Sequence, residues 1–265
     1  MLVTVDSLAL PALDAYRDLA HPDRLAARGL FVAEGRLVVA RLVALASHRL
    51  HSVLLTPAAQ AAMSDVIVRV PPEVPVYVAA QDTMNAVAGF NIHRGCLALA
   101  ERPAPVRWPP RDLATVDRVL VLEGVNNPDN VGGLFRAGAA LGAVAVLLGP
   151  RCGDPLYRKA IRTSMGATLA LPTYHAGRWP DALDDLRGAG VTIVACTPDP
   201  VAPSLYAVDL PRRAAVLVGA EGPGLSAAAR AAADLQVRVP MHGGLDSLNV
   251  TTAAAIVLSA LDRPS

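Results

Sequence analysis

Three loops in the second half of the chain hold side chains that could do chemistry. The first loop, residues 123–136, contains Asn130, a glycine pair and Arg136. Asn130 is placed either to cap the helix expected after it or to contact a ligand. Arg136 could form a surface ion pair or stabilise negative charge at a reaction centre. The loop therefore offers an amide and a fixed positive charge close together in the sequence.

The second loop, residues 218–226, has three glycines and a proline and leads into an expected helix capped by Ser226. Such a backbone can present its amide groups to a ligand. Glu221 stands in this turn either as an ordinary turn residue or as a ligand contact. The chain has no GxxxxGK[ST] pattern, and no GxGxxG pattern follows the first strand of this half. Neither a nucleotide-phosphate loop nor a dinucleotide cofactor is therefore indicated.

The third loop, residues 239–252, runs into the last expected helix. Ser247 is the expected cap of that helix, and Asn249 is a poor helix former just inside it. A poor helix former at such a place indicates a tertiary or ligand contact. His242 is expected to be an ordinary loop residue.

The cysteines indicate neither a disulfide framework nor a metal site. Cys96, Cys152 and Cys196 are widely spaced, odd in number and outside any CxxC pair. Free thiols in a reducing compartment fit this pattern best, and no metal is expected. The chain also shows no secretory signal and no apolar stretch long enough for a membrane span, which predicts a cytoplasmic protein.

The elements that position the three loops alternate between strand and helix. Such alternation, with continuous apolar strands, predicts a parallel sheet covered on both faces, whose ligands lie at the carboxyl ends of the strands. The expected strands are residues 119–123, 143–148, 168–171, 191–196, 215–218 and 236–239. The expected helices are residues 131–141, 155–163, 181–188, 226–234 and 247–261.

The first half predicts a second, smaller α/β domain without a catalytic set. Its expected strands are residues 31–35, 53–56, 66–70, 76–78 and 96–100, with helices at 36–47 and from 57 onward. Four prolines within residues 101–110 interrupt regular structure. The expected division is a domain at 1–100, a proline-rich linker at 101–114 and a second domain at 115–265.

Charge is concentrated locally rather than over the whole chain. The net charge of the 265 residues is +1 at pH 7, and Lys159 is the single lysine. The segment 151–162 contains four basic residues and one acidic residue, Asp154. The basic residues are Arg151, Arg158, Lys159 and Arg162. This segment is either a solvated helix face or a surface that contacts the phosphates of RNA.

Taken together, the three loops resemble the three motifs of the SpoU (TrmH-like) branch of the SPOUT methyltransferases. The matching segments are residues 130–136, 218–225 and 237–241 with 247–250, in the family's order and after strands. The resemblance covers about residues 116–262. The first half resembles, more loosely, the substrate-binding domain often attached in this family, through residues 31–35 and 93–98.

This resemblance implies a fold and a cofactor. The implied fold is a trefoil-knotted, mostly parallel-sheet methyltransferase domain preceded by a small α/β RNA substrate-binding domain. The implied cofactor is S-adenosylmethionine, held mostly by backbone groups of the last two loops. The corresponding positions are Leu217, Gly219, Val239, Met241 and Leu248. The resemblance also implies a homodimer with the active site near its interface.

The implied reaction is methylation of a ribose 2′-hydroxyl of RNA, with ribosomal RNA favoured over transfer RNA because of the added first domain. Arg136 carries the activating role by resemblance, and since guanidinium is too basic to accept a proton we interpret that role as positioning and charge stabilisation. The groups expected to hold Arg136 and the ribose are Asn130, Glu221, Ser247 and Asn249.

Three other functions are compatible with parts of the sequence. A non-catalytic RNA-binding or ribosome-assembly protein on the same scaffold is the main alternative, and the presence of Arg136, Glu221 and Asn249 argues against it. A doubly wound oxidoreductase lacks its dinucleotide fingerprint. A methyltransferase of the same fold that acts on a base is disfavoured by the Ser-Leu-Asn-Val run at 247–250.

Overall fold

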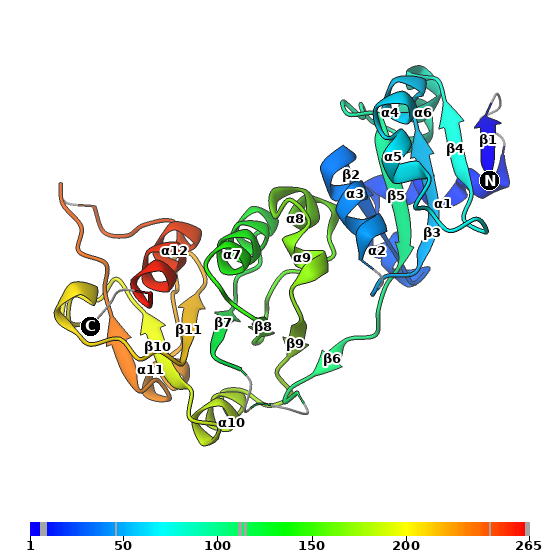
Figure 1. Cartoon of the computed structure of the whole chain (residues 1–265). Helices are drawn as coiled ribbons and strands as arrows, with labels where there is room; N and C mark the ends of the chain where they lie inside the picture. The colour runs from blue at the N-terminus through cyan, green and yellow to red at the C-terminus, as the bar shows by residue number, and fades with distance from the viewer. Residues whose placement is uncertain (6–9, 46, 111–112, 114–115, 244, 263–265) are drawn as a thin grey trace. The chain divides into compact units, whose positions relative to one another are not determined.

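The computed structural model describes residues 1–5, 10–45, 47–110, 113, 116–243 and 245–262. The chain forms two compact units (Figure 1). Unit 1 consists of Met1–Ala104 together with Leu156–Ala170, and unit 2 consists of Pro105–Pro155 together with Leu171–Ser265. A division at the proline-rich segment alone would have placed residues 156–170 in the second unit. In the structure their apolar side chains pack in the core of unit 1.

Unit 1 is built on a five-stranded sheet with the order β1-β4-β3-β5-β2. Strand β4 is parallel to β1 and β3, whereas β5 runs antiparallel to both β3 and β2. The strands are β1 (Leu2–Val5), β2 (Leu30–Glu34), β3 (Leu50–Leu55), β4 (Val76–Ala79) and β5 (Cys96–Glu101).

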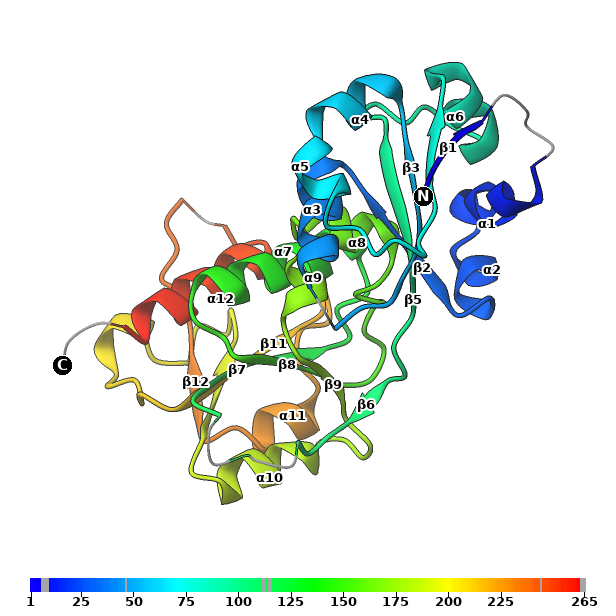
Figure 2. The ribbon, with the colours of Figure 1, turned by 45° about the vertical axis from the view of Figure 1, so that its right-hand side comes forward.

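Helices cover both faces of this sheet (Figure 2). On one face, Leu54, Leu97 and Leu99 pack against α1 (Asp14–Arg17), α2 (Pro22–Ala27) and α6 (Gln81–Ala88). The other face carries Phe31, Val53 and Leu55. It is covered by α3 (Arg36–Ala44), α4 (Pro57–Ala62), α5 (Ser64–Ile67), α8 (Arg158–Thr163) and α9 (Ala167–Ala170). Two 3₁₀ turns, Pro11–Leu13 and Asp18–Ala20, flank α1.

Two sequence-based strand predictions were wrong. Residues 66–70, expected to be a strand, begin inside helix α5, and residues 168–171, also expected to be a strand, lie mostly in helix α9. Both are short apolar runs, for which periodicity does not separate a strand from a buried helix. Val66 and Leu169 are buried in the unit 1 core, whereas Val68 points to solvent.

Unit 2 is built on a seven-stranded sheet with the order β12-β10-β11-β7-β8-β9-β6, and each described pair of neighbouring strands is parallel. This confirms the expected parallel sheet. The strands are β6 (Val106–Arg107), β7 (Arg118–Glu123), β8 (Ala145–Leu148), β9 (Thr173–His175), β10 (Thr192–Cys196), β11 (Ala214–Gly219) and β12 (Leu235–Val237). Strand β6 lies within the proline-rich segment as an edge strand paired with β9, which is where a sheet tolerates neighbouring prolines.

Helices also cover both faces of the unit 2 sheet. On one face, α10 (Ala182–Gly188) and α11 (Ala227–Ala231) bury side chains against Val121, Ile193 and Leu217. On the other face, α7 (Pro128–Ala140) and α12 (Val250–Ala260) pack against each other, and α12 also packs on β11. A 3₁₀ turn, Leu205–Ala207, follows β10. Within the described ranges, no helix is long and apolar enough to cross a membrane.

Candidate functional site

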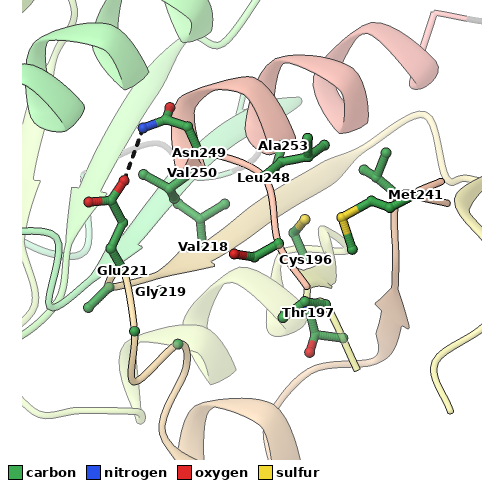
Figure 3. A pocket seen from close by; sticks show the side chains of 16 residues that line it. Cys196, Thr197, Val218, Gly219, Glu221, Met241, Leu248, Asn249, Val250 and Ala253 are labelled. Carbon is green, nitrogen blue, oxygen red and sulfur yellow. Dashed lines mark hydrogen bonds between the residues drawn. The ribbon is translucent and has the colours of Figure 1, made fainter. Parts of the chain in front are cut away.

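A cavity of about 440 Å³ lies at the carboxyl ends of β10, β11 and β12 in unit 2 (Figure 3). Its walls are the segments that follow these strands together with the first turn of α12. Apolar side chains and glycine backbone make up most of the wall. The described lining residues are Cys196, Thr197, Pro198, Val218, Gly219, Ala220, Glu221, Gly222, Gly224, Val239, Met241, Ser247, Leu248, Asn249, Val250 and Ala253. The cavity therefore occupies the place that a parallel sheet offers to a ligand.

The loop after β11 is folded tightly onto itself. A Cβ atom at Gly219 would lie 2.3 Å from the carbonyl carbon of Gly224, so no other residue fits there without moving backbone. The Gly224 amide donates to the Ala220 carbonyl at 2.9 Å, and Gly222 and Gly224 both have positive φ angles, 84° and 68°. Glycine is the residue that reaches such angles without strain. The tight turn brings its backbone to the wall of the cavity.

A buried carboxylate fixes this loop from behind. Glu123 ends β7 and is 3% exposed. Its Oε2 accepts from the backbone N–H of Ser226 at 2.8 Å, and its Oε1 accepts from Trp179 Nε1 at 2.6 Å. Ser226 caps α11 as expected, because its hydroxyl accepts from the Ala229 N–H at 3.1 Å. Glu123 was not among the residues predicted from the sequence to form the site. A charged residue at the end of a buried strand was the available signal.

Asn249 joins two other predicted site residues at the edge of the cavity. Its Nδ2 donates to Asn130 Oδ1 at 2.9 Å and to Glu221 Oε1 at 3.0 Å; Figure 3 shows the second bond. We call Asn130, Glu221 and Asn249 the amide–carboxylate cluster. Residues from α7, from the loop after β11 and from the start of α12 are thus brought together across more than a hundred residues of sequence.

The helix caps differ from those expected. Asn249, not Ser247, caps α12, since its Oδ1 accepts from the Thr251 N–H at 2.9 Å. Asn127, not Asn130, caps α7, since its Oδ1 accepts from the Asp129 N–H at 2.9 Å. Asn130 lies inside α7 and is 7% exposed. Its side chain is therefore available to the amide–carboxylate cluster rather than to the helix end.

The expected cofactor positions fall mostly on the cavity wall. Gly219, Val239, Met241 and Leu248 line it. Leu217 is not among the described lining residues, because its fully buried side chain points into the core beneath α10 and α11. Ser247 also lines the cavity and is exposed to solvent.

Arg136 stands apart from this arrangement. It lies near the end of α7, is exposed, and is not among the described residues that line the cavity. It lies six positions after Asn130, which places the two side chains on different faces of the helix. Within one copy of the chain, the structure does not bring Arg136 to the cavity wall.

The four expected RNA contacts divide between the two units. Arg151 belongs to unit 2, whereas Arg158, Lys159 and Arg162 belong to unit 1. Arg158 Nη1 lies 2.6 Å from Glu34 Oε2, and Arg162 Nη1 lies 3.6 Å from the same oxygen. Part of the positive charge of this segment is therefore compensated by a carboxylate from the first half of the chain.

Cys196 and Thr197 line the cavity without having been expected to do so. Burial raises the pKa of the Cys196 thiol to about 11, so this side chain is a neutral thiol at physiological pH. Among the described residues, no group of three or more His, Cys, Asp or Glu side chains could hold a metal ion.

Comparison with known proteins gives the same assignment for the second half of the chain. Residues 117–259 match the model of the SpoU rRNA Methylase family. An uncharacterized tRNA/rRNA methyltransferase of Mycobacterium bovis is 43% identical over 253 residues, which cover 93% of this chain and 86% of that protein.

Two further relatives have more specific names. The 23S rRNA (guanosine(2553)-2′-O)-methyltransferase RlmP of Bacillus subtilis is 30% identical, over 69% of this chain and 70% of its own length. A solved structure described as an RNA 2′-O ribose methyltransferase is 28% identical, has a TM-score of 0.77 and aligns over 98% of both chains. The likeness to the solved structure extends over both units of this chain.

Proposed function

Because the chain belongs to the SpoU rRNA methylase family, we propose that it transfers a methyl group from S-adenosylmethionine to a ribose 2′-hydroxyl of RNA. The observation that carries this proposal is the amide–carboxylate cluster, which holds polar groups at the edge of the cavity. The names of the Bacillus subtilis relative and of the solved structure, both 2′-O-methyltransferases, support ribose as the methylated group.

The cavity fits S-adenosylmethionine in size and in the chemistry of its wall. About 440 Å³ is within the range of roughly 300–1,000 Å³ typical of small-molecule sites. Apolar side chains of Val239, Met241 and Leu248 suit a purine ring, and the glycine backbone after β11 can present amide and carbonyl groups. When bound, this cofactor supplies a methyl group on a positively charged sulfur. We assign the binding to Gly219, Val239, Met241 and Leu248, with Leu217 contributing through its backbone.

The side chains at the cavity edge would orient the ribose. Asn249 is held by three hydrogen bonds that use both atoms of its amide, so it cannot rotate freely. It in turn orients the Glu221 carboxylate, whose second oxygen can accept a hydrogen bond from a ribose hydroxyl. Ser247 adds a further hydroxyl on the same wall. Holding the hydroxyl oxygen in line with the methyl group lowers a large part of the activation free energy of methyl transfer.

We propose that Arg136 acts in a homodimer, at the cavity of the other copy. Arg136 is exposed on α7 and does not line the cavity of its own chain. From the partner subunit it could reach the ribose and stabilise the negative charge that develops on the oxygen. This arrangement would make each site incomplete in a monomer.

Mixing two inactive variants tests this arrangement. R136A and N249A are each expected to lose methyl transfer. If Arg136 acts across the interface, half of the dimers in an equimolar mixture are mixed, and each has one intact site, which restores about a quarter of the wild-type activity. If Arg136 acts within its own chain, the mixture stays inactive. Cofactor affinity of R136A is expected to stay near that of the wild type.

The remaining assignments concern the whole chain. We propose a cytoplasmic protein in which unit 1 binds the RNA substrate and unit 2 forms a trefoil-knotted methyltransferase domain; the division expected from the sequence, at a linker of residues 101–114, is replaced by the two units of the structure. Arg151, Lys159 and Arg162 are proposed to contact RNA, whereas the ion pair of Arg158 with Glu34 gives Arg158 a positioning role. The tight packing of the Gly219 turn against Gly224 is compatible with a knotted cofactor loop.

Ribosomal RNA is the proposed substrate class, supported by the name of the Bacillus subtilis relative. Mass spectrometry of nuclease-digested RNA, from cells with and without the protein, tests both the class of RNA and the chemical group that is methylated. A single 2′-O-methylated nucleotide should disappear from ribosomal RNA. Loss of a base methylation, or of a mark in transfer RNA, would contradict the proposal. A chain that binds no S-adenosylmethionine in a calorimetric titration would instead be the non-catalytic alternative.

A further inference from the structure

One edge of the unit 1 sheet gathers arginines from three distant parts of the sequence. At its centre is Glu34, the last residue of β2, which is 6% exposed. Arg158 Nη1 binds Glu34 Oε2 at 2.6 Å, and Arg162 Nη1 lies 3.6 Å from the same atom. Helix α8 packs against β2, and both views in Figures 1 and 2 show it there. Residues 124 positions apart in sequence therefore meet at one carboxylate.

Arg158 has a structural part in this arrangement. Its guanidinium lies 4.3 Å from the centre of the Phe90 ring and is bonded to Glu34, and its side chain is 22% exposed. A cation stacked on an aromatic ring and paired with a buried acid is held in place. Arg158 thus attaches α8 to β2 and leaves little of its charge for a ligand.

Arg94 and Arg36 lie beside Gly35, the residue that follows Glu34. Gly35, the residue after Glu34, has a φ angle of 95° and no side chain, and Cδ of Arg94 lies 3.3 Å from where its Cβ would be. The Gly35 amide donates to the Cys96 carbonyl at 2.9 Å, which fixes the turn before β5 against the end of β2. Arg36 is the first residue of α3, and both arginines are exposed.

Three exposed arginines therefore lie at the end of β2: Arg162 near Glu34, and Arg36 and Arg94 next to Gly35. We call these three residues the arginine edge. Arg162 keeps 48% of its side chain exposed and approaches Glu34 only at the longer distance. The whole chain carries a net charge of only +1, so an excess of positive charge here is a local feature. Guanidinium forks are matched to phosphate oxygens, to which they donate paired hydrogen bonds.

We propose that the arginine edge binds the sugar–phosphate backbone of the RNA substrate, with Glu34 and Arg158 as positioning residues. This proposal rests on the proposed methyltransferase function. It moves the RNA-contacting role away from Arg158, which the sequence alone had favoured, to Arg36 and Arg94, which the sequence alone had not indicated. Contacts of this kind are insensitive to base sequence and sensitive to salt, because they release counterions from the RNA.

The test compares two triple variants of the full chain. The first, R36Q/R94Q/R162Q, neutralises the arginine edge. The control, R24Q/R49Q/R69Q, neutralises three exposed arginines elsewhere on unit 1, two of which border a second, polar cavity of about 390 Å³. The probe is a fluorescein-labelled single-stranded RNA of mixed sequence, titrated by anisotropy between about 50 and 200 mM salt. Calorimetric affinity for S-adenosylmethionine checks that unit 2 is intact.

We expect the first variant to lower the slope of log K against log salt by about 2, at about 0.7 for each contact with a single strand. Loss of three such contacts corresponds to about a 10²-fold weaker affinity near 0.1 M salt. The control should bind RNA like the wild type. An unchanged slope in the first variant, or an equal loss in the control, would overturn the arginine edge as the RNA site.

Two further readouts separate this proposal from the proposed function. Polyglutamate that competes as well as unlabelled RNA would identify an acidic protein as the partner and overturn the RNA assignment of this surface. A wild-type chain that methylates RNA, while the first variant retains full RNA affinity, overturns only the arginine edge. A wild-type chain that binds S-adenosylmethionine and neither binds nor methylates RNA overturns both.

Discussion

At the level of single residues, Asn249 uses both atoms of its side-chain amide. The oxygen caps α12, and the nitrogen donates to Asn130 and Glu221. The two roles can be separated by substitution, because aspartate caps a helix about as well as asparagine but cannot donate a hydrogen bond.

We therefore expect N249D to keep the cap of α12 and to lose activity. The new carboxylate would face the oxygens of Asn130 and Glu221, so the amide–carboxylate cluster would separate. A misplacement of about 1 Å between the ribose hydroxyl and the methyl group would reduce methyl transfer by about 10²-fold. N249A should lose the cap as well, and this loss should lower its free energy of unfolding by about 1 kcal/mol. Single-turnover transfer from methyl-labelled cofactor, together with urea unfolding, gives both quantities. Wild-type turnover in N249D would remove the cluster from the mechanism.

Cys196 gives a second prediction at this scale, one that depends on pH. Burial raises the pKa of its thiol to about 11, and only the thiolate is alkylated rapidly. The alkylation rate by iodoacetamide should therefore keep rising between pH 8 and 10 by about tenfold per pH unit, whereas an ordinary thiol levels off above a pKa of about 8.5.

Peptide mapping after timed alkylation measures this rate for each cysteine, and C196S identifies the corresponding peptide. S-adenosylmethionine should slow the reaction further, since Cys196 lines the cavity proposed to bind it. A rate that levels off near pH 8.5 would contradict the raised pKa of the Cys196 thiol. A rate that the cofactor leaves unchanged would contradict the place of Cys196 in the cofactor site.

At the scale of elements, the approach of α7 to α12 sets the geometry of the site. Gly133 lies where α12 passes, and a Cβ atom there would be 2.7 Å from Thr251 Oγ1 and 2.9 Å from its Cγ2. Thr251 also donates from its hydroxyl to the Asn130 carbonyl at 3.5 Å. The two helices thus meet through a glycine and a threonine one turn from the amide–carboxylate cluster.

G133A should lower the free energy of unfolding by about 1–3 kcal/mol, because overpacking exceeds the gain of about 1 kcal/mol in helix propensity. T251A removes both clashing atoms, so the double variant should be more stable than the sum of the single effects predicts. Urea unfolding of the wild type, the two single variants and the double variant provides the double-mutant cycle. G188A is the control, since a Cβ atom there meets nothing within 4 Å. Additive effects in the cycle would mean that the two helices do not meet at this point.

At the scale of the whole molecule, the second half of the chain supplies part of the first unit. Ile161 of α8 and Leu169 of α9 are buried in the same core as Phe31 and Val53. After leaving unit 1 at residue 104, the chain returns to it at residue 156 and leaves it again at residue 170. A substitution in this segment should therefore act on the unit formed mostly by the first hundred residues.

I161A is expected to cost about 2–5 kcal/mol, the usual effect of truncating a fully buried isoleucine. Hydrogen exchange followed by mass spectrometry should show faster exchange in β2, β3 and β5, with β7 and β11 unchanged. L134A, in the buried face of α7, is the matched control and should give the opposite pattern. Faster exchange in β7 and β11 of I161A would assign the segment to unit 2.

The sequence by itself determined the alternation of the second half and the three loops of the site. Apolar strands, glycine turns and caps such as Ser226 depend on neighbours a few residues away, and they predicted the parallel sheet and most of the cavity wall. Asn249 was singled out in this way, whereas Gly219, Met241 and Leu248 were predicted as cofactor positions only through the resemblance to the SpoU family; all four line the cavity.

Only the tertiary structure decided which of the neighbouring polar residues cap helices and which meet other elements. It gave the capping roles to Asn127 and Asn249 and left Asn130 free to join the cluster. It also placed residues 156–170 in unit 1, Arg162 near Glu34 and Arg94 near Gly35. Each cap joins residues two positions apart, but neighbouring asparagines offered competing caps. The contacts of the cluster and of Glu34 join residues from 28 to 124 positions apart, and local periodicity carries no information about such pairs.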